Sequence, residues 1–309
     1  MSFLRSLALF PILLLCVPVT YDSLVQAQST SVLTNANVTF TTVDVPGADF
    51  TGVVGINTAG DMVGDYGQST NGEAHGFLYT NGVFTYFDYP GQTVTEPSGI
   101  NDAGLIVGSA GQNPVVGFLY DGTTFTPIQH GHDNATIALG INNASDVVGG
   151  TGTIYTTKAF ELRSGRFRDI SPPGTYIYIY ATGINNFGKI VGWTDDDGFA
   201  YDGGKFKRIA FPGANQTEAW GINDKGVIVG WYASSECICA FALRTGRYLS
   251  FRYPGAAGTL AYGINNLGQV VGGYTFDYET WHGFVTSPIT AGDFASSACC
   301  QGAAAKRNQ

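Results

Sequence analysis

The chain has 309 residues, a net charge of −9 and only 13% charged residues, which excludes the basic surface that nucleic acid or an anionic membrane requires of a partner. Its 43 glycines and 13% aromatic residues are typical of many short strands separated by tight turns. No helical period with caps is present after the first 27 residues. The sequence therefore predicts an all-β protein that is long enough to bury one large core.

The first 27 residues have the three parts of a secretory signal. Arg5 gives the positive start, residues 7–19 form an apolar run, and Val25-Gln26-Ala27 offers small residues for cleavage. The apolar run is too short and too interrupted by proline to span a membrane. We therefore predict a mature protein that begins near Gln28, has no membrane span, and is exported to the periplasm or the extracellular space.

A repeat of about 42 residues occupies most of the remaining chain. Each copy begins with Gly-Ile-Asn and a turn that usually ends in glycine, with Ser145 as the exception. Because the asparagine recurs in every copy, we expect its side chain to cap this turn. An apolar pair closed by glycine follows, then a Gly-Phe or Ala-Phe segment, and then an aromatic segment that usually ends in Pro-Gly. These four runs predict four antiparallel strands. The six copies, called repeats one to six, begin their motif at Gly55, Gly99, Gly140, Gly183, Gly221 and Gly263.

Four strands in about 42 residues is the size of one propeller blade. The sixth repeat ends after its third strand, near Thr286, and the missing aromatic Pro-Gly strand stands at the other end, in residues 38–47. If this N-terminal strand completes the last blade, the ring closes and leaves no exposed sheet edge. The sequence thus predicts a six-bladed β-propeller of four-stranded antiparallel blades over residues 28–288, and a disordered tail over residues 289–309.

The Gly-Phe and Ala-Phe segments carry a resemblance to a known repeat. Four of them are His75-Gly76-Phe77, His282-Gly283-Phe284, Ala159-Phe160 and Ala240-Phe241. With them, roughly residues 38–286 resemble the HAF family, an extracellular repeat of exported bacterial proteins. The resemblance implies the repeat architecture and export, and it brings no substrate and no catalytic residues.

The loops of the predicted propeller sort into two faces. The Asn-x-x-Gly turns and the turns before the aromatic strands are short and uniform, so we expect that face to be structural. The other face carries the variable loop after each Val-Gly, and variable loops on a constant scaffold usually bind. Its aromatic side chains could stack on sugar rings or contact a protein, or they could pack between blades. The predicted ligand-binding residues are Tyr66, Trp193, Trp231, Tyr232, Tyr274 and Trp281.

Two glutamates suggest a catalytic alternative. Glu96 and Glu218 occupy the same position in repeats two and five, which would face each other across a six-fold ring. Paired carboxylates share acid and base chemistry on glycosides when they lie roughly 5–10 Å apart. The competing interpretation is two solvated acids at the rim of the channel.

Metal sites have weaker support. Where other repeats have Pro-Gly, the third has His130-Gly131-His132-Asp133, whose histidines and carboxylate could ligate zinc. Asp195-Asp196-Asp197 could hold calcium through hard oxygen ligands. The alternatives are a degenerate crossover loop and a solvated acidic turn.

The cysteines leave their pairing open. Cys237 and Cys239, like Cys299 and Cys300, are too close in sequence for an easy internal bridge, so we expect any disulfide to join the loop to the tail.

These observations favour an exported, non-catalytic binding module that recognises a glycan or a protein through the variable-loop face. The sequence contains no Gly-x-Ser-x-Gly elbow, phosphate loop or dinucleotide fingerprint. One alternative is a hydrolase or lyase that acts on polysaccharide. A second is a structural component of the envelope or matrix.

Overall fold

Repeats one to four each form a separate four-stranded antiparallel sheet in the computed structural model, which describes residues 32–34, 38–68, 72–131, 135–153 and 156–294. Each strand pairs with the next along the chain, as short turns between antiparallel strands require. The strands are β3 (Phe50–Ile56), β4 (Met62–Gly67), β5 (His75–Thr80), β6 (Val83–Phe87), β7 (Thr95–Ile100), β8 (Ile106–Ala110), β9 (Val116–Tyr120), β10 (Phe125–Ile128), β11 (Ala135–Ile141), β12 (Val147–Gly152), β13 (Thr157–Arg163), β14 (Arg166–Ile170), β15 (Ile179–Ile184), β16 (Ile190–Thr194), β17 (Gly198–Asp202) and β18 (Lys205–Ile209).

Repeats five and six share one nine-stranded sheet, where the sequence predicts two separate sheets. A single parallel pair, Ile238 with Gly258, joins the two repeats, and β1 adds to the edge of β22 in parallel. The described residues therefore form five sheets. The strands of the large sheet are β1 (Val32–Thr34), β2 (Phe40–Val43), β19 (Gln216–Ile222), β20 (Ile228–Ala233), β21 (Ile238–Arg244), β22 (Arg247–Phe251), β23 (Gly258–Ile264), β24 (Val270–Thr275) and β25 (His282–Thr286).

The N-terminal strand β2 pairs antiparallel with β25, the third strand of repeat six. The pairing runs from Phe40 opposite Thr286 to Val43 opposite Gly283. Asp44, which follows β2, accepts a hydrogen bond from the N–H of Gly283 at 3.1 Å and lies 2.8 Å from Nδ1 of His282. The strand that repeat six lacks is thus supplied from the other end of the chain, as predicted.

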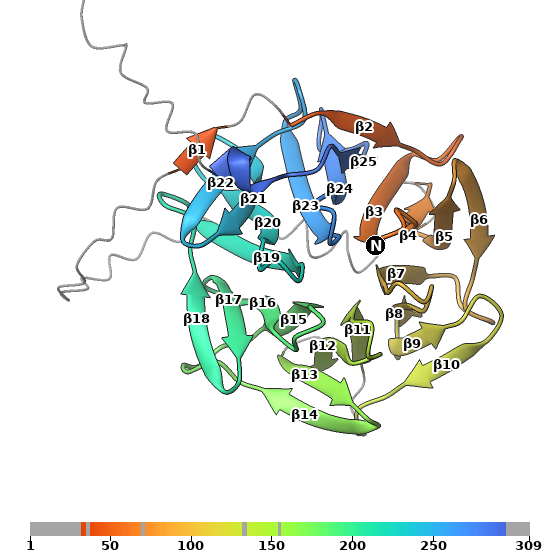
Figure 1. The fold of residues 1–309 in the computed structure, drawn as a ribbon. Coiled ribbons are helices and arrows are strands. Elements are labelled where there is room, and N and C mark those ends of the chain that lie inside the picture. Colours follow the sequence, from red (N-terminus) through yellow and green to blue (C-terminus); the bar gives the residue numbers. More distant parts are fainter. Residues whose placement is uncertain (1–31, 35–37, 69–71, 132–134, 154–155, 295–309) are drawn as a thin grey trace, which may run out of the picture.

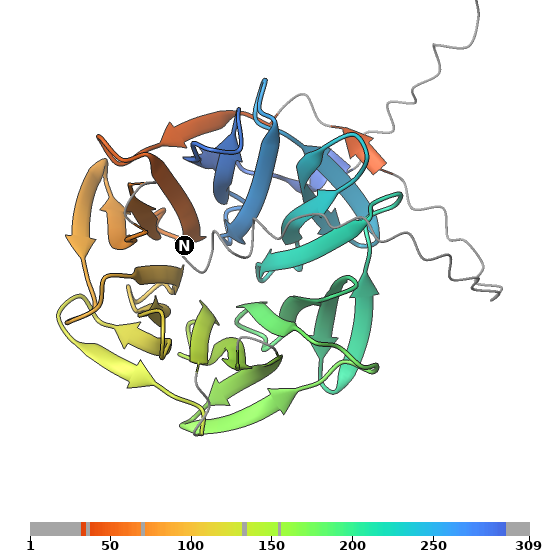
Figure 2. The ribbon, with the colours of Figure 1, turned by 180° about the vertical axis from the view of Figure 1, so that it is seen from behind.

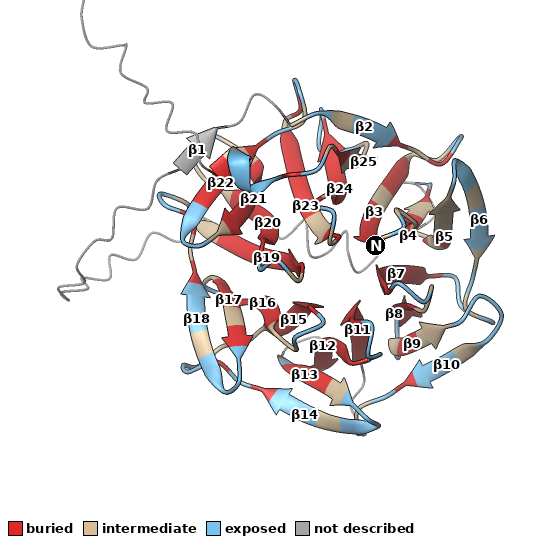
Figure 3. Ribbon diagram, viewed as in Figure 1, coloured by how far each residue is buried: buried red, intermediate tan, exposed pale blue. Residues whose placement is uncertain are grey.

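The sheets are arranged around a common centre (Figures 1 and 2). The first strand of each repeat lies nearest the centre and the aromatic strand lies outermost (Figure 1). Burial follows this order: β7 and β15 are buried throughout, whereas β6 is mostly exposed (Figure 3). The phenylalanines of the third strands fill the core, and each is at most 3% exposed; they are Phe77, Phe118, Phe160, Phe199, Phe241 and Phe284.

A bulge and a glycine shape each inner strand pair. In repeat five, the register between β19 and β20 shifts between Ala219 and Gly221. Gly230 faces this bulge, and a Cβ there would lie 1.9 Å from the backbone oxygen of Glu218. The glycine that closes each apolar pair is therefore required by the close approach of the two backbones.

The end of the described chain corrects the predicted tail. Ala291–Phe294 form a 3-10 helix, η1, and Phe294 is buried against the core of the large sheet. The guanidinium of Arg247 donates a hydrogen bond of 3.0 Å to the carbonyl oxygen of Phe294. A buried aromatic side chain thus orders residues that the sequence predicts to be disordered.

The predicted signal segment and the rest of the tail, with Cys299 and Cys300, lie outside the described residues. Among the residues that are described, no helix is long and apolar enough to cross a membrane.

Candidate functional site

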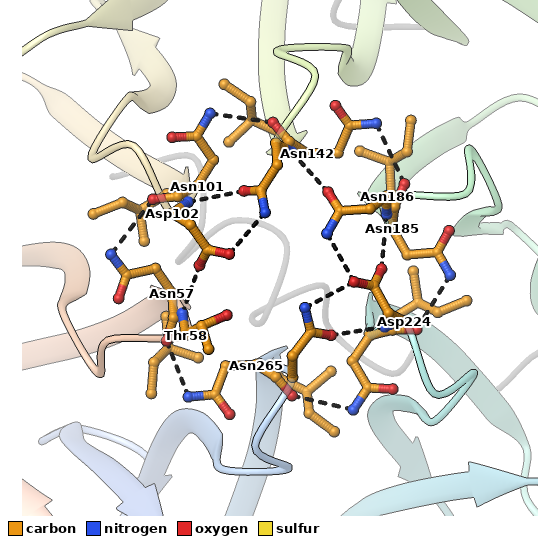
Figure 4. A pocket seen from close by; sticks show the side chains of 18 residues that line it. Asn57, Thr58, Asn101, Asp102, Asn142, Asn185, Asn186, Asp224 and Asn265 are labelled. Atoms are coloured by element: carbon orange, nitrogen blue, oxygen red, sulfur yellow. Dashed lines mark hydrogen bonds between the residues drawn. The ribbon is translucent and has the colours of Figure 1, made fainter.

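The asparagines of the six Gly-Ile-Asn motifs surround the centre (Figure 4). Each caps its own turn, as predicted: the Asp61 N–H, for example, donates to Oδ1 of Asn57 at 2.9 Å. The side-chain amide of each also donates to the backbone oxygen of the asparagine in the next repeat, and these bonds are 3.0 to 3.4 Å long. The circuit is complete and runs Asn57, Asn101, Asn142, Asn185, Asn223, Asn265 and back to Asn57.

The residues after these asparagines form a second polar layer. The Thr58 N–H donates to Asp102 at 2.8 Å, and the amides of Asn186 and Asn266 both donate to Asp224 at 2.8 Å. Burial raises the pKa of Asp102, but hydrogen bonds from the Thr58 N–H and from the Asn143 amide hold it below its ordinary value. The layers surround a pocket of about 70 Å³, which is large enough for ordered waters.

A second group of residues, here called the tryptophan cluster, packs on the inner strands. It contains all four tryptophans of the chain: Trp193, Trp220 and Trp231 are buried, and Trp281 is partly buried. The ring of Tyr180 lies 4.7 Å from that of Trp193, between centroids. Nε1 of Trp193 is buried and has no hydrogen-bond acceptor among the described residues. Because buried donors are rarely left unpaired, this indole indicates a place where an acceptor from outside the protein is needed.

Glu218 lies within the same cluster and is 2% exposed. Its carboxylate accepts hydrogen bonds from Nε1 of Trp220 at 3.0 Å and from Nε2 of Gln216 at 2.8 Å. Burial raises the pKa of Glu218 to about 8, although hydrogen bonds from Trp220, Gln216 and Trp231 oppose the rise. A substantial fraction of this side chain is therefore protonated at neutral pH.

Asp65 is a second central acid, which the sequence analysis missed. It lies on β4, is 4% exposed, and pairs with Gly52, so its carboxylate occupies the space that a side chain at Gly52 would take. Burial raises the pKa of Tyr262, and the charges of Glu218 and Asp65 raise it further. The only signal in the sequence is that other repeats have serine, glycine or tryptophan where repeat one has Asp65.

The predicted ligand-binding aromatics do not form one surface. Trp193, Trp231 and Trp281 belong to the tryptophan cluster. Tyr232 and Tyr274 are also buried, but they stack on Phe211 and Tyr253, each at 3.6 Å. Tyr66 contacts the rings of His75 and Tyr86 instead. The physical reason is that neighbouring residues of a strand, such as Trp231 and Tyr232, point to opposite faces of the sheet.

The predicted catalytic glutamates and the predicted metal ligand His130 lie in different parts of the blades. Glu96 and Glu218 are each 2% exposed and lie on the inner strands β7 and β19. His130 lies against the outermost strand β14, 4.5 Å from the ring of Phe167 and 3.5 Å from the carboxylate of Asp169. His132 and Asp133 lie outside the described residues. The hypothesis that the glutamates and histidines form one pocket therefore has no support in the described part of the chain.

The acidic loop and the cysteines have structural partners. Asp195 accepts hydrogen bonds from the N–H groups of Ile177 at 2.6 Å and Tyr178 at 2.8 Å, and Asp197 pairs with Arg208. Within the described ranges, no three His, Cys, Asp or Glu side chains gather as a metal site would require. Cys237 and Cys239 form a disulfide across a Cα–Cα distance of 5.7 Å. The expectation that a disulfide would join the loop to the tail is therefore wrong for Cys237 and Cys239.

No protein-family model matches this sequence, and no curated protein is similar to it at a significant level. Among solved structures, the chain is similar to TolB from Acinetobacter baumannii, with 11% identity and a TM-score of 0.52 over 73% of this chain and 63% of that one. It is also similar to virginiamycin B lyase from Staphylococcus aureus, with 10% identity and a TM-score of 0.48 over 83% of this chain and 90% of that one. The β-propeller domain of the Trilobed protease from Pyrococcus furiosus has 10% identity and a TM-score of 0.48, over 74% and 79% of the two chains. At such identities the likeness concerns the fold alone.

Proposed function

We propose that this chain is an exported binding module built as a closed six-bladed β-propeller of the HAF type. Two features of the centre support six blades in a ring. The asparagine circuit returns from Asn265 to Asn57. The motif glycines also approach one another in the same order, so that a Cβ on Gly263 would lie 3.5 Å from the Cα of Gly55. Export is supported by the signal-like first 27 residues.

The unpaired indole of Trp193 carries the proposed binding function. An unpaired buried donor costs about 1–3 kcal/mol, and a bound hydroxyl or carbonyl group would remove that cost. The partly buried rings of Tyr178 and Trp281 lie in the same cluster, where they would present apolar faces to a ligand. Aromatic faces beside a hydrogen-bond donor suit the recognition of a sugar ring. We therefore place the ligand, a glycan or the side chains of a protein, at the exposed margin of the tryptophan cluster.

The polysaccharide hydrolase or lyase is the weaker candidate. A general acid or base must come within hydrogen-bond reach of its substrate. Glu96 and Glu218 are each 2% exposed, and both oxygens of Glu218 already accept hydrogen bonds from Gln216 and Trp220. A substrate would therefore have to replace hydrogen bonds that Glu218 already accepts, whereas Nε1 of Trp193 has no acceptor among the described residues.

The test begins with a glycan array, with and without calcium and zinc, followed by titration of each bound glycan. Because all four tryptophans lie in one cluster, binding there should change the intrinsic tryptophan fluorescence. Trp193→Phe keeps the ring and removes the donor, so it should weaken binding at least about tenfold. Val83→Ala, on the exposed strand β6, is the matched control and should leave binding unchanged.

Three outcomes would redirect the proposal. Binding without a fluorescence change would move the ligand away from the tryptophan cluster. Loss of bound glycan with time would favour the enzyme. An array without any binding would exclude a glycan from the set tested and leave a protein ligand or a structural role.

A further inference from the structure

The positive charges of this protein are confined to one part of the chain. Of the 15 Lys and Arg residues, Arg5, Lys306 and Arg307 lie at the ends, and the other twelve all fall between Lys158 and Arg252. Residues 28–157 contain no Lys or Arg. Because each repeat is one sector of the structure, the sectors of repeats one and two carry acids without bases (Figure 1). The molecule is therefore strongly polarised from one side to the other.

A second asymmetry concerns the tips of the Asn-x-x-Gly turns. The third residue of the turn is alanine in repeats one to three: Ala59, Ala103 and Ala144. In repeats four to six it is larger: Phe187, Lys225 and Leu267. Phe187 is 78% exposed and Leu267 is 53% exposed. The N–H groups of Ala103 and Ala144 make the same hydrogen bond to the asparagine of their turn as those of Phe187 and Leu267, so the fold does not require a large side chain at this position. These exposed apolar side chains are available for contact with another molecule.

On the face that carries the Asn-x-x-Gly turns, positive and negative charges lie in opposite repeats. Lys225 and the turn Arg244–Arg247 belong to repeat five, and Asp102 and the turn that begins at Asp121 belong to repeat two. The asparagine circuit places repeats two and five opposite each other, three steps apart in either direction. In repeats three and four, two of the nearby bases are already paired: Arg163 lies 2.8 Å from Asp146, and Lys189 lies 3.2 Å from Asp202. Arg166 and Lys205, at the starts of β14 and β18, are exposed.

We infer that the Asn-x-x-Gly face binds a second copy of this chain, face to face, about a two-fold axis that lies in the plane of the face. This axis places repeat five of one copy opposite repeat two of the other. It also places repeat four opposite repeat three, and repeat six opposite repeat one. Each large tip then meets an alanine tip: Phe187 meets Ala144, Lys225 meets Ala103, and Leu267 meets Ala59. The bases of repeat five meet the acids of repeat two twice, as an isologous interface requires. This inference goes beyond the proposed ligand binding and uses the other face of the molecule.

The oligomeric state tests the inference directly. We would express the full chain with its own N-terminal segment and measure its mass in solution by light scattering and sedimentation over a range of concentrations and salt. The expected result is a dimer that weakens as salt rises, because opposite charges at its rim are screened. The double variant Phe187→Ala with Leu267→Ala should weaken the dimer about tenfold or more. Ile177→Ala, which removes a comparably exposed apolar group from the opposite face, just before β15, should leave it unchanged.

Exchanging charges across the interface gives the decisive experiment. Lys225→Glu should weaken the dimer, and Ala103→Lys should weaken it as well, because each brings like charges together across the interface. Both residues are exposed turn tips, so folding should be unaffected, which circular dichroism would check. The two changes in one chain should restore the dimer. A monomer at every concentration would overturn the inference. So would a dimer that is insensitive to the tip variants, or one that the double charge exchange fails to restore.

Discussion

The side-chain amide of Asn265 donates a hydrogen bond of 3.0 Å to the backbone oxygen of Asn57, 208 positions away in the sequence. Each of the other five asparagines makes the same bond to the following repeat. Asn265 also caps its own turn by accepting hydrogen bonds from the N–H groups of Leu267 and Gln269. One side chain thus stabilises a turn and joins the last repeat to the first.

Asn265→Ala should therefore lower the free energy of unfolding by about 2–3 kcal/mol, because it removes a cap and an inter-repeat hydrogen bond. Asn101→Ala is the matched control, since it removes the same bonds between repeats two and three. Urea unfolding of both variants would measure the two costs. Equal costs are expected of a closed ring. A much smaller cost for Asn265→Ala would mean that the last repeat is not joined to the first.

Gly230→Ala should destabilise the fold severely. The new Cβ would lie 1.9 Å from the carbonyl oxygen of Glu218, so β19 and β20 would have to separate at the bulge. We expect a loss of about 3 kcal/mol or more in thermal or urea unfolding. Gly292→Ala is the control, because its Cβ would meet nothing closer than 3.5 Å. A Gly230→Ala variant as stable as the parent would show that the first two strands are not packed this closely.

Glu218→Gln should change how stability depends on pH. Burial raises the pKa of Glu218 from 4.5 to about 8, so between these values the folded chain binds more protons than the unfolded chain. The contribution of Glu218 to stability is therefore greatest below the unfolded pKa and falls as pH rises through the folded pKa, with a slope of up to about 1.4 kcal/mol per pH unit. The uncharged glutamine removes this slope.

Urea unfolding of the parent and of Glu218→Gln, at several values between about pH 5 and pH 9, would measure the effect. The difference in stability should move in favour of the glutamine variant as pH rises. Asp65 and Glu96 are kept in both proteins, so their titration cancels in the comparison. Parallel pH profiles for the two proteins would show that Glu218 titrates with an ordinary pKa.

Trp193→Phe should stabilise the protein while weakening its binding. The indole N–H has no acceptor among the described residues, and its removal would relieve a cost of about 1 kcal/mol or more. Part of that gain would be lost to the smaller ring, so we expect a rise in stability of up to about 1 kcal/mol in thermal unfolding. Trp220→Phe is the contrasting variant: it removes a hydrogen bond to Glu218 and should destabilise the protein. Destabilisation by Trp193→Phe would indicate that an ordered water already satisfies the indole.

Much of the architecture could be predicted because the repeat is visible in the amino-acid sequence. The spacing of Gly-Ile-Asn located the inner strands, and the incomplete sixth repeat located β2 as the partner of β25. The asparagine caps also followed from the sequence, because a cap bonds within its own turn. The spacing of the repeats and their turn residues were sufficient to predict these features, since both depend on the local geometry of strands and turns.

The site could not be predicted to the same degree. The sequence put Trp231 and Tyr232 in one binding surface, whereas strand alternation sends one to the tryptophan cluster and the other onto Phe211. It missed Asp65, whose place beside Gly52 depends on the pairing of two strands. It also expected a disordered tail where Phe294 fills a gap in the core.

The sequence by itself determined the repeat, its strands and the strand exchanged between the two ends, because these follow from local periodicity. Only the tertiary structure decided which side chains meet at the centre. The burial of Glu218, the unpaired indole of Trp193 and the bond from Asn265 to Asn57 each depend on contacts between segments distant in the chain. Such contacts depend on how the sheets are placed around one another, which no single repeat encodes.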